Sequence, residues 1–559
     1  MNILPISVVV LALTLITDAS RADQKKPFPV NIQVHAEEPI GELKPLWRFF
    51  GADEPNYATR KNGEKLLAEL GDLRPDQVYF RTHNLLTSGD GTPDLKWGST
   101  GVYTEDSRDN PVYHWTILDG IFDSYRAHHL RPYVQMGFMP EALSIHPEPY
   151  HYKWTSRDPY QWIFTGWSYP PKDYAKWSEL IYQWTAHDLA RYGRAEMTHW
   201  YWETWNEANI GYWQGKPEDF FKLHDFAVSG VRRALPEARV GGPDSAGGGT
   251  PFLHAFLEHC LHGTNYATGQ IGTPIDFISF HAKGSPVFTN DHVRMGIANQ
   301  LRNMNSAFRI IASFPELKSK PIVIGESDPD GCAACQGDQL GYRNGTIYAS
   351  YTAATLEREF ELADRDQVNL EGALTWAFEF EDAPPFAGFR VLASDGIDLP
   401  VLNAFRMFAK MEGQRVAVES SGKIPLDAIL KDGVRGKPDV SAIASLGRRQ
   451  LCVLIWHYHD EEVPGPAAHV TLSLDGLPKT KNVRLRHFRI DDEHSNAFTE
   501  WKAMNAPLPI SNAQANALQT AGQLAELEPE RQIQAVEGKW VLELNLPRNA
   551  LSLLVFTWQ

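Results

Sequence analysis

The sequence predicts an α/β protein in which a (β/α)8 TIM barrel is followed by a C-terminal β-sandwich domain. From about residue 45 to 411, short β-like runs alternate with amphipathic helical stretches, the pattern of a barrel made of βα units. After residue 412 the pattern changes to short strands separated by turn residues, which is typical of a sandwich. The 559 residues are enough for two or three domains.

The barrel prediction depends on the order of its elements along the chain. The expected strands are residues 47–51, 78–82, 131–137, 198–204, 239–242, 276–281, 321–326 and 372–378. The helical stretches between them are 63–70, 117–128, 174–192, 217–234, 293–312 and 348–363. A doubly wound open sheet is the rival fold. It is disfavoured because no Gly-rich phosphate loop follows the first strand, as a dinucleotide-binding fold would require.

The second domain, residues 412–559, is expected to contain strands but also one helical insertion. Its predicted strands are 440–445, 450–457, 469–474, 482–490, 539–546 and 550–558. The Ala- and Gln-rich stretch 513–528 is expected to be helical. Residues 23–44 include a strand at 30–35 that precedes the barrel and is expected to pair with the sandwich.

The N-terminal residues 1–22 have the features of a secretory signal peptide. An apolar stretch from residue 3 to 16 is too short to span a bilayer, and small residues follow it, so that cleavage is expected after Ala19 or Ala22. No Lys or Arg precedes the apolar stretch, and an uncleaved anchor is the alternative interpretation. We therefore expect an exported protein, periplasmic or extracellular, that has no contact with the membrane after cleavage.

The charge balance limits the partners that the protein can have. The chain has 53 Lys and Arg residues against 69 Asp and Glu residues, a net charge of −16. A general nucleic-acid binder needs a basic surface, so this class is excluded. The sequence does not indicate an oligomeric state.

The four cysteines are too few for a fold held together by disulfides. Cys332 and Cys335 form a CxxC in a Gly-flanked loop, and no second pair is present to complete a structural zinc site. In an oxidising compartment a small disulfide that stiffens the loop is expected. A free thiol pair and a metal site are the alternatives.

Two acidic residues are at positions where a barrel carries its chemistry. Active sites of (β/α)8 barrels lie at the C-terminal ends of the strands. Glu207 follows the expected fourth strand, and Glu326 ends the seventh. Hydrolysis of a glycosidic bond needs one carboxyl group that protonates the leaving oxygen and another that stabilises or attacks the anomeric centre. A helix-start acid and a loop ion pair are the structural alternatives, but two matching strand ends favour catalysis.

Several motifs resemble one family of retaining glycosidases. The segment Trp205-Asn206-Glu207 resembles the Trp-Asn-Glu-Pro element of barrels whose catalytic glutamates end strands four and seven. More specifically, the chain is similar to glycoside hydrolase family 39, which includes β-xylosidases and α-L-iduronidase. The spacing of the two glutamates and the stretches 81–84, 210–215 and 280–282 fit that family, and the stretch 489–497 resembles its β-xylosidase branch.

The resemblance implies a role for each residue of the motif. Glu207 would be the general acid/base and Glu326 the nucleophile, with Asn206 bonded to the sugar 2-hydroxyl. Two positions depart from the pattern. Ala208 replaces the usual Pro, and Ser327 stands where many relatives carry an aromatic residue.

Other polar residues at strand ends are candidates for contact with the sugar. His83 and His281 end strands two and six, where a neutral imidazole could donate to one hydroxyl and accept from another. Arg81 lies two residues before His83, so its side chain is expected to point to the same face of the strand. It could contact the sugar or pair with a buried acid such as Glu203.

Aromatic and acidic residues after strands four and eight complete the expected sugar site. Trp376 would provide an apolar floor, and Glu381, slightly favoured over Glu379, would accept from hydroxyls. Trp213 and its neighbour Tyr212 lie just beyond Glu207 and could contact the sugar. The alternative is that the acids only line the rim of the barrel.

Together these observations predict a cofactor-free and metal-free retaining exo-glycosidase that binds small oligosaccharides. The expected reaction is release of β-1,4-linked xylose from the non-reducing ends of xylo-oligosaccharides. An arabinoside, a galactoside or a uronide is the alternative substrate, and a uronide would require Lys or Arg against its carboxylate. A catalytically inactive carbohydrate-binding protein is the alternative from another class.

Overall fold

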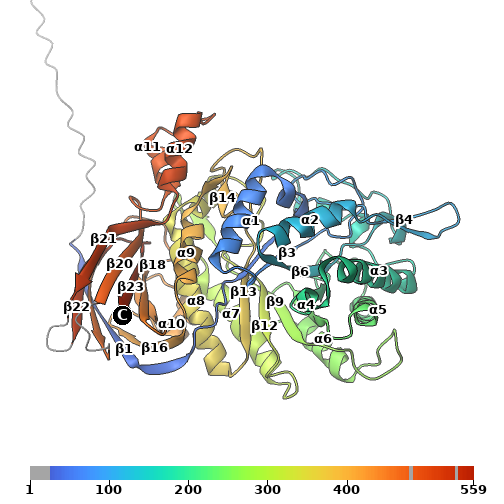
Figure 1. Cartoon of the computed structure of the whole chain (residues 1–559), viewed down its shortest axis with the longest axis horizontal. Helices are drawn as coiled ribbons and strands as arrows, with labels where there is room; N and C mark the ends of the chain where they lie inside the picture. The colour runs from blue at the N-terminus through green and yellow to red at the C-terminus, as the bar shows by residue number, and fades with distance from the viewer. Residues whose placement is uncertain (1–25, 477–482, 535–538, 559) are drawn as a thin grey trace, which may run out of the picture.

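A computed structural model describes residues 26–476, 483–534 and 539–558 (Figure 1). The predicted signal peptide, residues 1–22, lies outside this described part, as does residue 482 at the start of one predicted strand. Figure 1 shows the helix-rich barrel on the right and a region of mostly strands on the left, with helices α8 and α9 between them.

In the described part of the chain, eight parallel strands close into a barrel, which confirms the predicted (β/α)8 architecture. The strands are, in chain order, β2 (Phe49–Ala52), β3 (Val78–Thr82), β6 (Leu130–Met136), β7 (Tyr201–Thr204), β8 (Arg239–Ser245), β9 (Phe277–Lys283), β12 (Ile322–Asp328) and β13 (Leu370–Thr375). Each predicted barrel strand corresponds to one of them. β7 is therefore the fourth barrel strand and β12 the seventh.

Helices cover the outside of the barrel. They are α1 (Lys61–Leu73), α2 (Thr116–Ala127), α3 (Tyr174–Tyr192), α4 (Arg194–Met197), α5 (Pro217–Ala234), α6 (Pro251–His262), α7 (Ile297–Ala312), α8 (Thr346–Asp366) and α9 (Pro400–Ala409). Local sequence sets several starts: the Asp173 side chain accepts from two backbone N–H groups at the start of α3, and Thr250 caps α6. The helix predicted at 293–312 starts later, because His292–Arg294 pairs with Val287–Thr289 in a hairpin.

Short two-stranded elements and 3-10 turns lie in the loops of the barrel. These are β4 (Tyr103–Glu105) with β5 (Pro111–Tyr113), β10 (Val287–Thr289) with β11 (His292–Arg294), β14 (Ala393–Ser394) with β15 (Ile397–Asp398), and the turns η1 (Pro55–Thr59), η2 (Glu141–Leu143), η3 (Tyr160–Ile163), η4 (Gly166–Ser168) and η5 (Asp338–Asn344).

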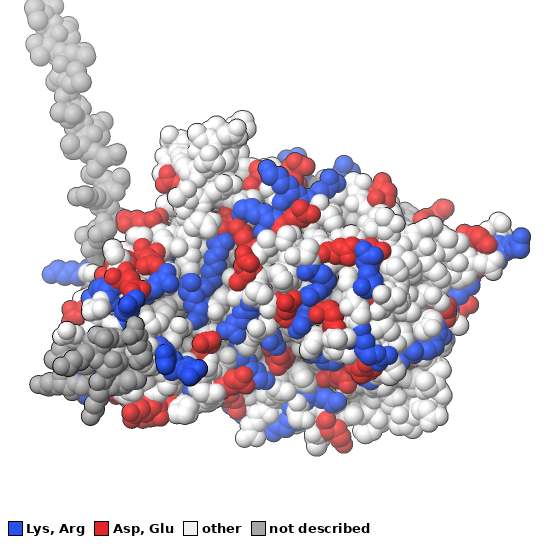
Figure 2. All heavy atoms as spheres, viewed as in Figure 1, with Lys and Arg blue, Asp and Glu red and all other residues white. Residues whose placement is uncertain are grey.

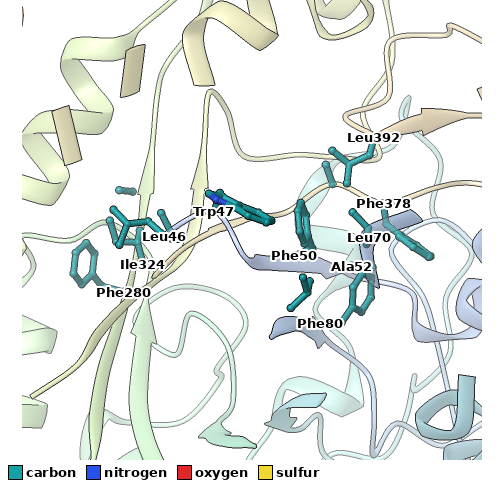
Figure 3. Packing of buried hydrophobic residues seen from close by; sticks show 14 of the residues in the cluster. Leu46, Trp47, Phe50, Ala52, Leu70, Phe80, Phe280, Ile324, Phe378 and Leu392 are labelled. Atoms are coloured by element: carbon teal, nitrogen blue, oxygen red, sulfur yellow. The ribbon is translucent and has the colours of Figure 1, made fainter. Parts of the chain in front are cut away.

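The barrel interior is layered because alternate residues of each strand point inward. One layer is aromatic: Phe49, Tyr79, Tyr133, Tyr201 and Phe277 form a buried cluster inside the barrel. Two residues further along the strands, the inward positions carry polar side chains, which form the floor of the site described below. Outside the barrel, apolar residues pack against the helices, as Figure 3 shows for Trp47, Phe50 and Phe80.

The strands outside the barrel form one sheet of nine among the described residues, in the order β21-β20-β23-β18-β17-β16-β1-β19-β22. Their bounds are β1 (Phe28–Glu42), β16 (Gln414–Ser420), β17 (Asp439–Leu446), β18 (Gln450–Tyr458), β19 (Ala468–Asp475), β20 (Val483–Ile490), β21 (Ala525–Ile533), β22 (Trp540–Leu546) and β23 (Leu551–Trp558). The N-terminal strand β1 is antiparallel to β16 and parallel to β19. Residues from both ends of the sheet share one apolar core, so the sheet folds over itself as a sandwich does.

The insertion predicted as one helix at 513–528 is helical only in its first part. Helix α12 spans Asn512–Ala521 and is preceded by α11 (Ala497–Ala503), whereas residues from Ala525 onward belong to β21. The prediction was wrong there because β21 pairs with β20, and this pairing overrides the helical propensity of the segment. A further short helix, α10 (Leu426–Asp432), lies between β16 and β17.

On the face that Figure 2 shows, acidic and basic side chains are mixed over the barrel and the sheet region. Within the described ranges, none of the helices combines the length and the apolar character that crossing a bilayer would require.

A buried ion pair joins the barrel to the sheet. Nη2 of Arg358, on α8, lies 3.2 Å from both carboxylate oxygens of Asp439 at the start of β17, and it also donates to the Ile424 carbonyl oxygen. Asp439 accepts further hydrogen bonds from the Ile424 backbone and from Trp456 Nε1. Both charged side chains are buried, so neither can be hydrated if its partner is removed.

Replacement of Arg358 by Met is therefore expected to lower the free energy of unfolding by about 3–5 kcal/mol, because it leaves Asp439 buried and unpaired. Urea denaturation of the variant and the wild type measures the difference. Arg365→Met is the matched control on the same helix, since its partner Asp427 is exposed and such pairs contribute about 1 kcal/mol or less. Equal losses in the two variants would contradict this role of Arg358.

Candidate active site

A cavity of about 330 Å³ lies at the C-terminal ends of the barrel strands. Both predicted catalytic residues, Glu207 and Glu326, line it. This volume is near the lower end of the range of about 300–1,000 Å³ for small-molecule sites. The other residues that line it are Asp53, Lys96, Tyr160, Ile210, Tyr212, Lys283, Gly331, Cys332 and Trp376.

Glu326 lies in β12 among cationic groups. Its Oε2 is 2.5 Å from Lys283 Nζ, and its Oε1 is 3.8 Å from His281 Nε2 and 3.9 Å from Arg81 Nη1. Burial opposes ionisation, but His281, Lys283 and Arg81 outweigh it and hold the pKa of Glu326 well below its usual range. Glu326 is therefore an anion at neutral pH, as an attacking carboxylate must be.

The residue before Glu326 must be a glycine. A Cβ atom on Gly325 would lie 1.8 Å from Oδ1 of Asp244, so only a residue without a side chain leaves room for the Asp244 carboxylate. The Asp244 carboxylate can therefore bond to Arg81 and His281, two of the groups that lie beside Glu326.

Glu207 follows β7 and faces the same cavity. Its side chain is 16% exposed, and its Oε1 lies 2.8 Å from Nδ1 of His281. Its backbone N–H donates to the carbonyl oxygen of Asp244 at 3.0 Å. One imidazole ring thus has the two glutamates at its opposite nitrogens, and the pair can act on one bound sugar.

His281 connects the two glutamates instead of facing the sugar. Its Nδ1 donates to Glu207 and its Nε2 to Asp244, at 2.8 Å each. Burial lowers its pKa, but Asp244, Glu326 and Glu207 outweigh this effect and raise the pKa of His281 to about 10. The ring is a buried cation, and both of its nitrogens donate to protein carboxylates. The predicted contact of His281 with a sugar hydroxyl is therefore replaced by contacts with Glu207 and Asp244.

Arg81 has no exposed surface and supports the site from below. It donates to Glu203 at 2.7 Å and to Asn206 Oδ1 at 3.0 Å, and it is also bonded to Asp244. Of the two alternatives for Arg81, the structure shows the pairing with Glu203, and the guanidinium has no exposed surface toward the cavity. Asn206 Nδ2 is buried without a hydrogen-bond partner in the described part of the chain, so it can donate to a ligand.

His83 and Trp376 pack together at the wall of the cavity, with ring centroids 4.2 Å apart. Burial lowers the pKa of His83. Its neutral ring can donate from Nδ1 to Asp53 at 2.9 Å and accept at Nε2 from Arg81 at 3.2 Å. Gly51 makes room for the indole, because a Cβ there would lie 2.4 Å from the Trp376 ring. Trp376 lines the cavity as an apolar surface.

Two predicted contacts lie away from the cavity. Trp213 packs on Trp205, with ring centroids 5.2 Å apart, and donates to the Lys216 carbonyl oxygen, so that Tyr212 takes the cavity position instead. Glu381 accepts from the backbone N–H of Asn62 in the first turn of α1. A carboxylate at a helix N-terminus is favoured electrostatically, which explains its position.

Sequence reasoning missed three charged residues that line the cavity. Lys283 is two residues after His281 and Asp53 is two residues after Gly51, so strand alternation could have identified both. Lys96 comes from the loop between β3 and β4 and has no periodic signal.

The backbone around the cavity is strained. Asn84, Lys96, Trp205, Glu207 and Asp244 have φ angles between +46° and +66°, in the left-handed region that residues other than glycine rarely occupy. Such conformations cluster at functional sites, where the surrounding structure holds them in place. Here the strained positions include Trp205, the residue before Asn206, and Glu207, the predicted acid.

Cys332 and Cys335 form a disulfide, so the free-thiol and metal alternatives do not apply. Gly331 and Cys332 form part of the cavity wall. The guanidinium of Arg343 donates to the carbonyl oxygens of Cys332 and Cys335 and holds this loop against the barrel.

Glu359, on α8, is buried behind the nucleophile strand and accepts from Ser327 Oγ at 2.8 Å. Burial raises the pKa of Glu359 to about 8, against the opposing hydrogen bond from Ser327. Because an unfolded Glu titrates near pH 4.3, unfolding releases a proton between about pH 4.3 and 8. The contribution of Glu359 to stability therefore decreases as the pH rises through that range.

We expect Glu359→Gln to remove this dependence. The free energy of unfolding of the variant minus that of the wild type should rise between pH 5 and pH 8, by up to about 1.4 kcal/mol per pH unit. Urea denaturation at several pH values measures it, with the exposed Glu218→Gln as control. Parallel curves for Glu359→Gln and wild type would show that Glu359 is ionised in the native state.

Comparisons with known proteins give the relatives of this chain. A family model described as glycosyl hydrolases family 39 matches residues 30–532. The β-xylosidase of Caldicellulosiruptor saccharolyticus is 26% identical over 508 residues, covering 89% of this chain and 92% of that protein. The α-L-iduronidase of Mus musculus is 25% identical, covering 86% of this chain and 74% of that one.

A solved structure shares the whole architecture. A monomeric β-xylosidase from Caulobacter crescentus superimposes with a TM-score of 0.72 at 21% identity, covering 94% of this chain and 99% of that one. At this identity the likeness demonstrates the fold alone.

Proposed function

The chain belongs to glycosyl hydrolase family 39 and is a glycoside hydrolase, and on this premise we propose that it is a retaining exo-glycosidase. Glu326 is the nucleophile and Glu207 the general acid/base. The observation that carries this assignment is that both carboxylates line one cavity, with Glu326 held as an anion by the surrounding cations.

The reaction has two steps. In the first, a Glu326 oxygen bonds to the anomeric carbon while the bond to the leaving oxygen breaks, and Glu207 gives its proton to that oxygen. In the second, the Glu207 carboxylate takes a proton from water, the water oxygen bonds to the anomeric carbon, and Glu326 leaves as a carboxylate. Lys283 and His281 stabilise the negative charge that returns to Glu326.

The proposed substrate is a xylo-oligosaccharide that loses β-1,4-linked xylose from its non-reducing end. Two curated relatives, 26% and 25% identical over most of this chain, are β-xylosidases. The cavity is near the lower end of small-molecule site volumes, which favours an enzyme that takes the end of a chain.

A uronide is the second candidate, and one residue favours it. Lys283 lies in the cavity, and its ammonium is 2.5 Å from both Glu326 Oε2 and Asp328 Oδ2. An ammonium in this place could also bind a sugar carboxylate. Curated relatives of similar identity include α-L-iduronidases.

Hydrolysis of a panel of nitrophenyl glycosides tests the choice of sugar. The proposal expects the highest kcat/KM on the β-D-xylopyranoside. A higher value on an α-L-iduronide or a β-glucuronide, lost in Lys283→Met, would favour the second candidate. Binding of xylobiose with no cleavage of any glycoside would contradict catalysis altogether.

We also propose that the protein is exported. Disulfides such as Cys332–Cys335 form and persist in oxidising compartments, and the composition of residues 1–22 is that of a signal peptide. N-terminal sequencing of the protein from the periplasm or medium should give a start after Ala19 or Ala22. An intact N-terminus in the cytoplasm would contradict export.

A further inference from the structure

A second charged pair lines the cavity and is not used in the proposed reaction. Asp53 follows β2, the first barrel strand, and Lys96 lies in the loop between β3 and β4. Lys96 Nζ is bonded to Asp53 Oδ2, and both side chains are 5% exposed. A buried ion pair is weak evidence for stability, because the loss of hydration offsets the attraction between the charges.

The structure holds Lys96 in place at several points. Its backbone has a φ of +60°, its N–H donates to Glu54 Oε1 at 2.5 Å, and its carbonyl oxygen accepts from Tyr152. The ring of Tyr160, another cavity residue, lies 5.7 Å from the ammonium. A strained backbone kept by so many contacts is typical of a functional position.

The pair also lies close to the reacting centre. The imidazole of His83 has Asp53 at 2.9 Å from Nδ1 and Glu326 at 3.9 Å from Nε2. Asp53 is thus separated from the proposed nucleophile by one imidazole ring, so a sugar attacked by Glu326 can also reach Asp53 and Lys96.

Both members keep hydrogen-bonding capacity. An ammonium has three donors and a carboxylate about four acceptor sites. Among the described residues, Lys96 Nζ donates to Asp53, and Asp53 also receives the hydrogen bond from His83. Burial acts against both charges, but the Asp53 carboxylate holds the pKa of Lys96 well above its usual range. The Lys96 ammonium in turn lowers the pKa of Asp53.

We propose that Asp53 and Lys96 recognise two adjacent hydroxyl groups of the terminal sugar, a role that rests on the proposed function. Asp53 accepts a hydrogen bond from one hydroxyl, and Lys96 donates to its neighbour. The ring faces of Trp376 and Tyr212, in the same cavity, supply apolar surface for the sugar. The pair therefore selects pyranosides that have a free vicinal diol in the correct configuration.

A cycle of variants and substrate analogues tests this role. The substrates are an aryl β-xyloside and its 2-, 3- and 4-deoxy analogues, and the variants are Lys96→Met, Asp53→Asn and the double variant that removes both charges. On the parent xyloside each single variant should lose about 10- to 100-fold in kcat/KM. On the analogue that lacks the hydroxyl recognised by Lys96, Lys96→Met should lose less than about twofold further.

Controls separate recognition from folding. Lys172→Met removes a lysine bonded to Glu105 outside the cavity and should leave kcat/KM unchanged. Thermal melting identifies a single variant that fails to fold. In that case kcat/KM of the double variant, which has no unpaired buried charge, is measured on the same four substrates and tests the proposal in its place. An equal loss on the parent and on all three analogues, or no loss at all, would overturn the proposal.

Failure of the proposed function would look different. If the wild type hydrolyses another glycoside of the panel in place of the xyloside, the same cycle is run on the deoxy analogues of that sugar. If it hydrolyses none, the proposed function fails and this inference fails with it. Equal losses in an active wild-type background overturn the inference alone.

Discussion

Replacement of Glu326 by Ala is expected to lower kcat on an aryl β-xyloside by at least about 10⁴-fold, because the anion that forms the covalent intermediate is removed. The cations around Glu326 remain in place, so the cavity keeps its capacity to bind an anion. Added azide should therefore restore turnover and give a glycosyl azide of inverted anomeric configuration.

Two outcomes would contradict this role. One is turnover near that of the wild type without azide. The other is a rescued product of retained configuration, which would mean that azide attacks from the face that the leaving group has left, as expected when the acid/base residue and not the nucleophile has been removed. Glu381→Gln is the matched control, since that carboxylate binds the start of α1 away from the cavity and its loss should change kcat less than about twofold.

Replacement of Glu207 by Gln is expected to have an effect that depends on the leaving group. With xylobiose, whose leaving oxygen needs a proton, kcat should fall about 10²- to 10⁴-fold. With a dinitrophenyl xyloside the first step needs no acid, so the variant should release a burst of phenolate and then turn over slowly. Stopped-flow absorbance measures the burst, and an equal loss on both substrates without a burst would argue against the acid/base role.

The barrel could be predicted because its strands are short apolar runs that alternate with helical stretches. The two glutamates could be predicted from the same pattern, because residues at the C-terminal ends of the strands form the active site in this fold. Errors arose where tertiary pairing decides: residues from Ala525 pair with β20, and His292–Arg294 pairs within a hairpin. Neither pairing has a signal in the local sequence.

The site residues show the same limit. His281 and Arg81 were placed correctly at strand ends, but the sequence cannot tell whether a polar side chain is occupied by the ligand or by a protein carboxylate. Glu381 and Trp213 lie in loops, where the direction in which a side chain points does not follow a regular period along the sequence. Lys96 is brought to the cavity by a loop of irregular path, so only the folded chain reveals its contact with Asp53.

The most direct test of the two-glutamate mechanism is the anomeric configuration of the first-formed product. Proton NMR of the wild-type enzyme acting on an aryl β-xyloside should show β-xylose first, with the α-anomer appearing later by mutarotation, because two displacements at one carbon retain configuration. If α-xylose appears first, a single displacement by water has occurred, and Glu326 cannot be the nucleophile.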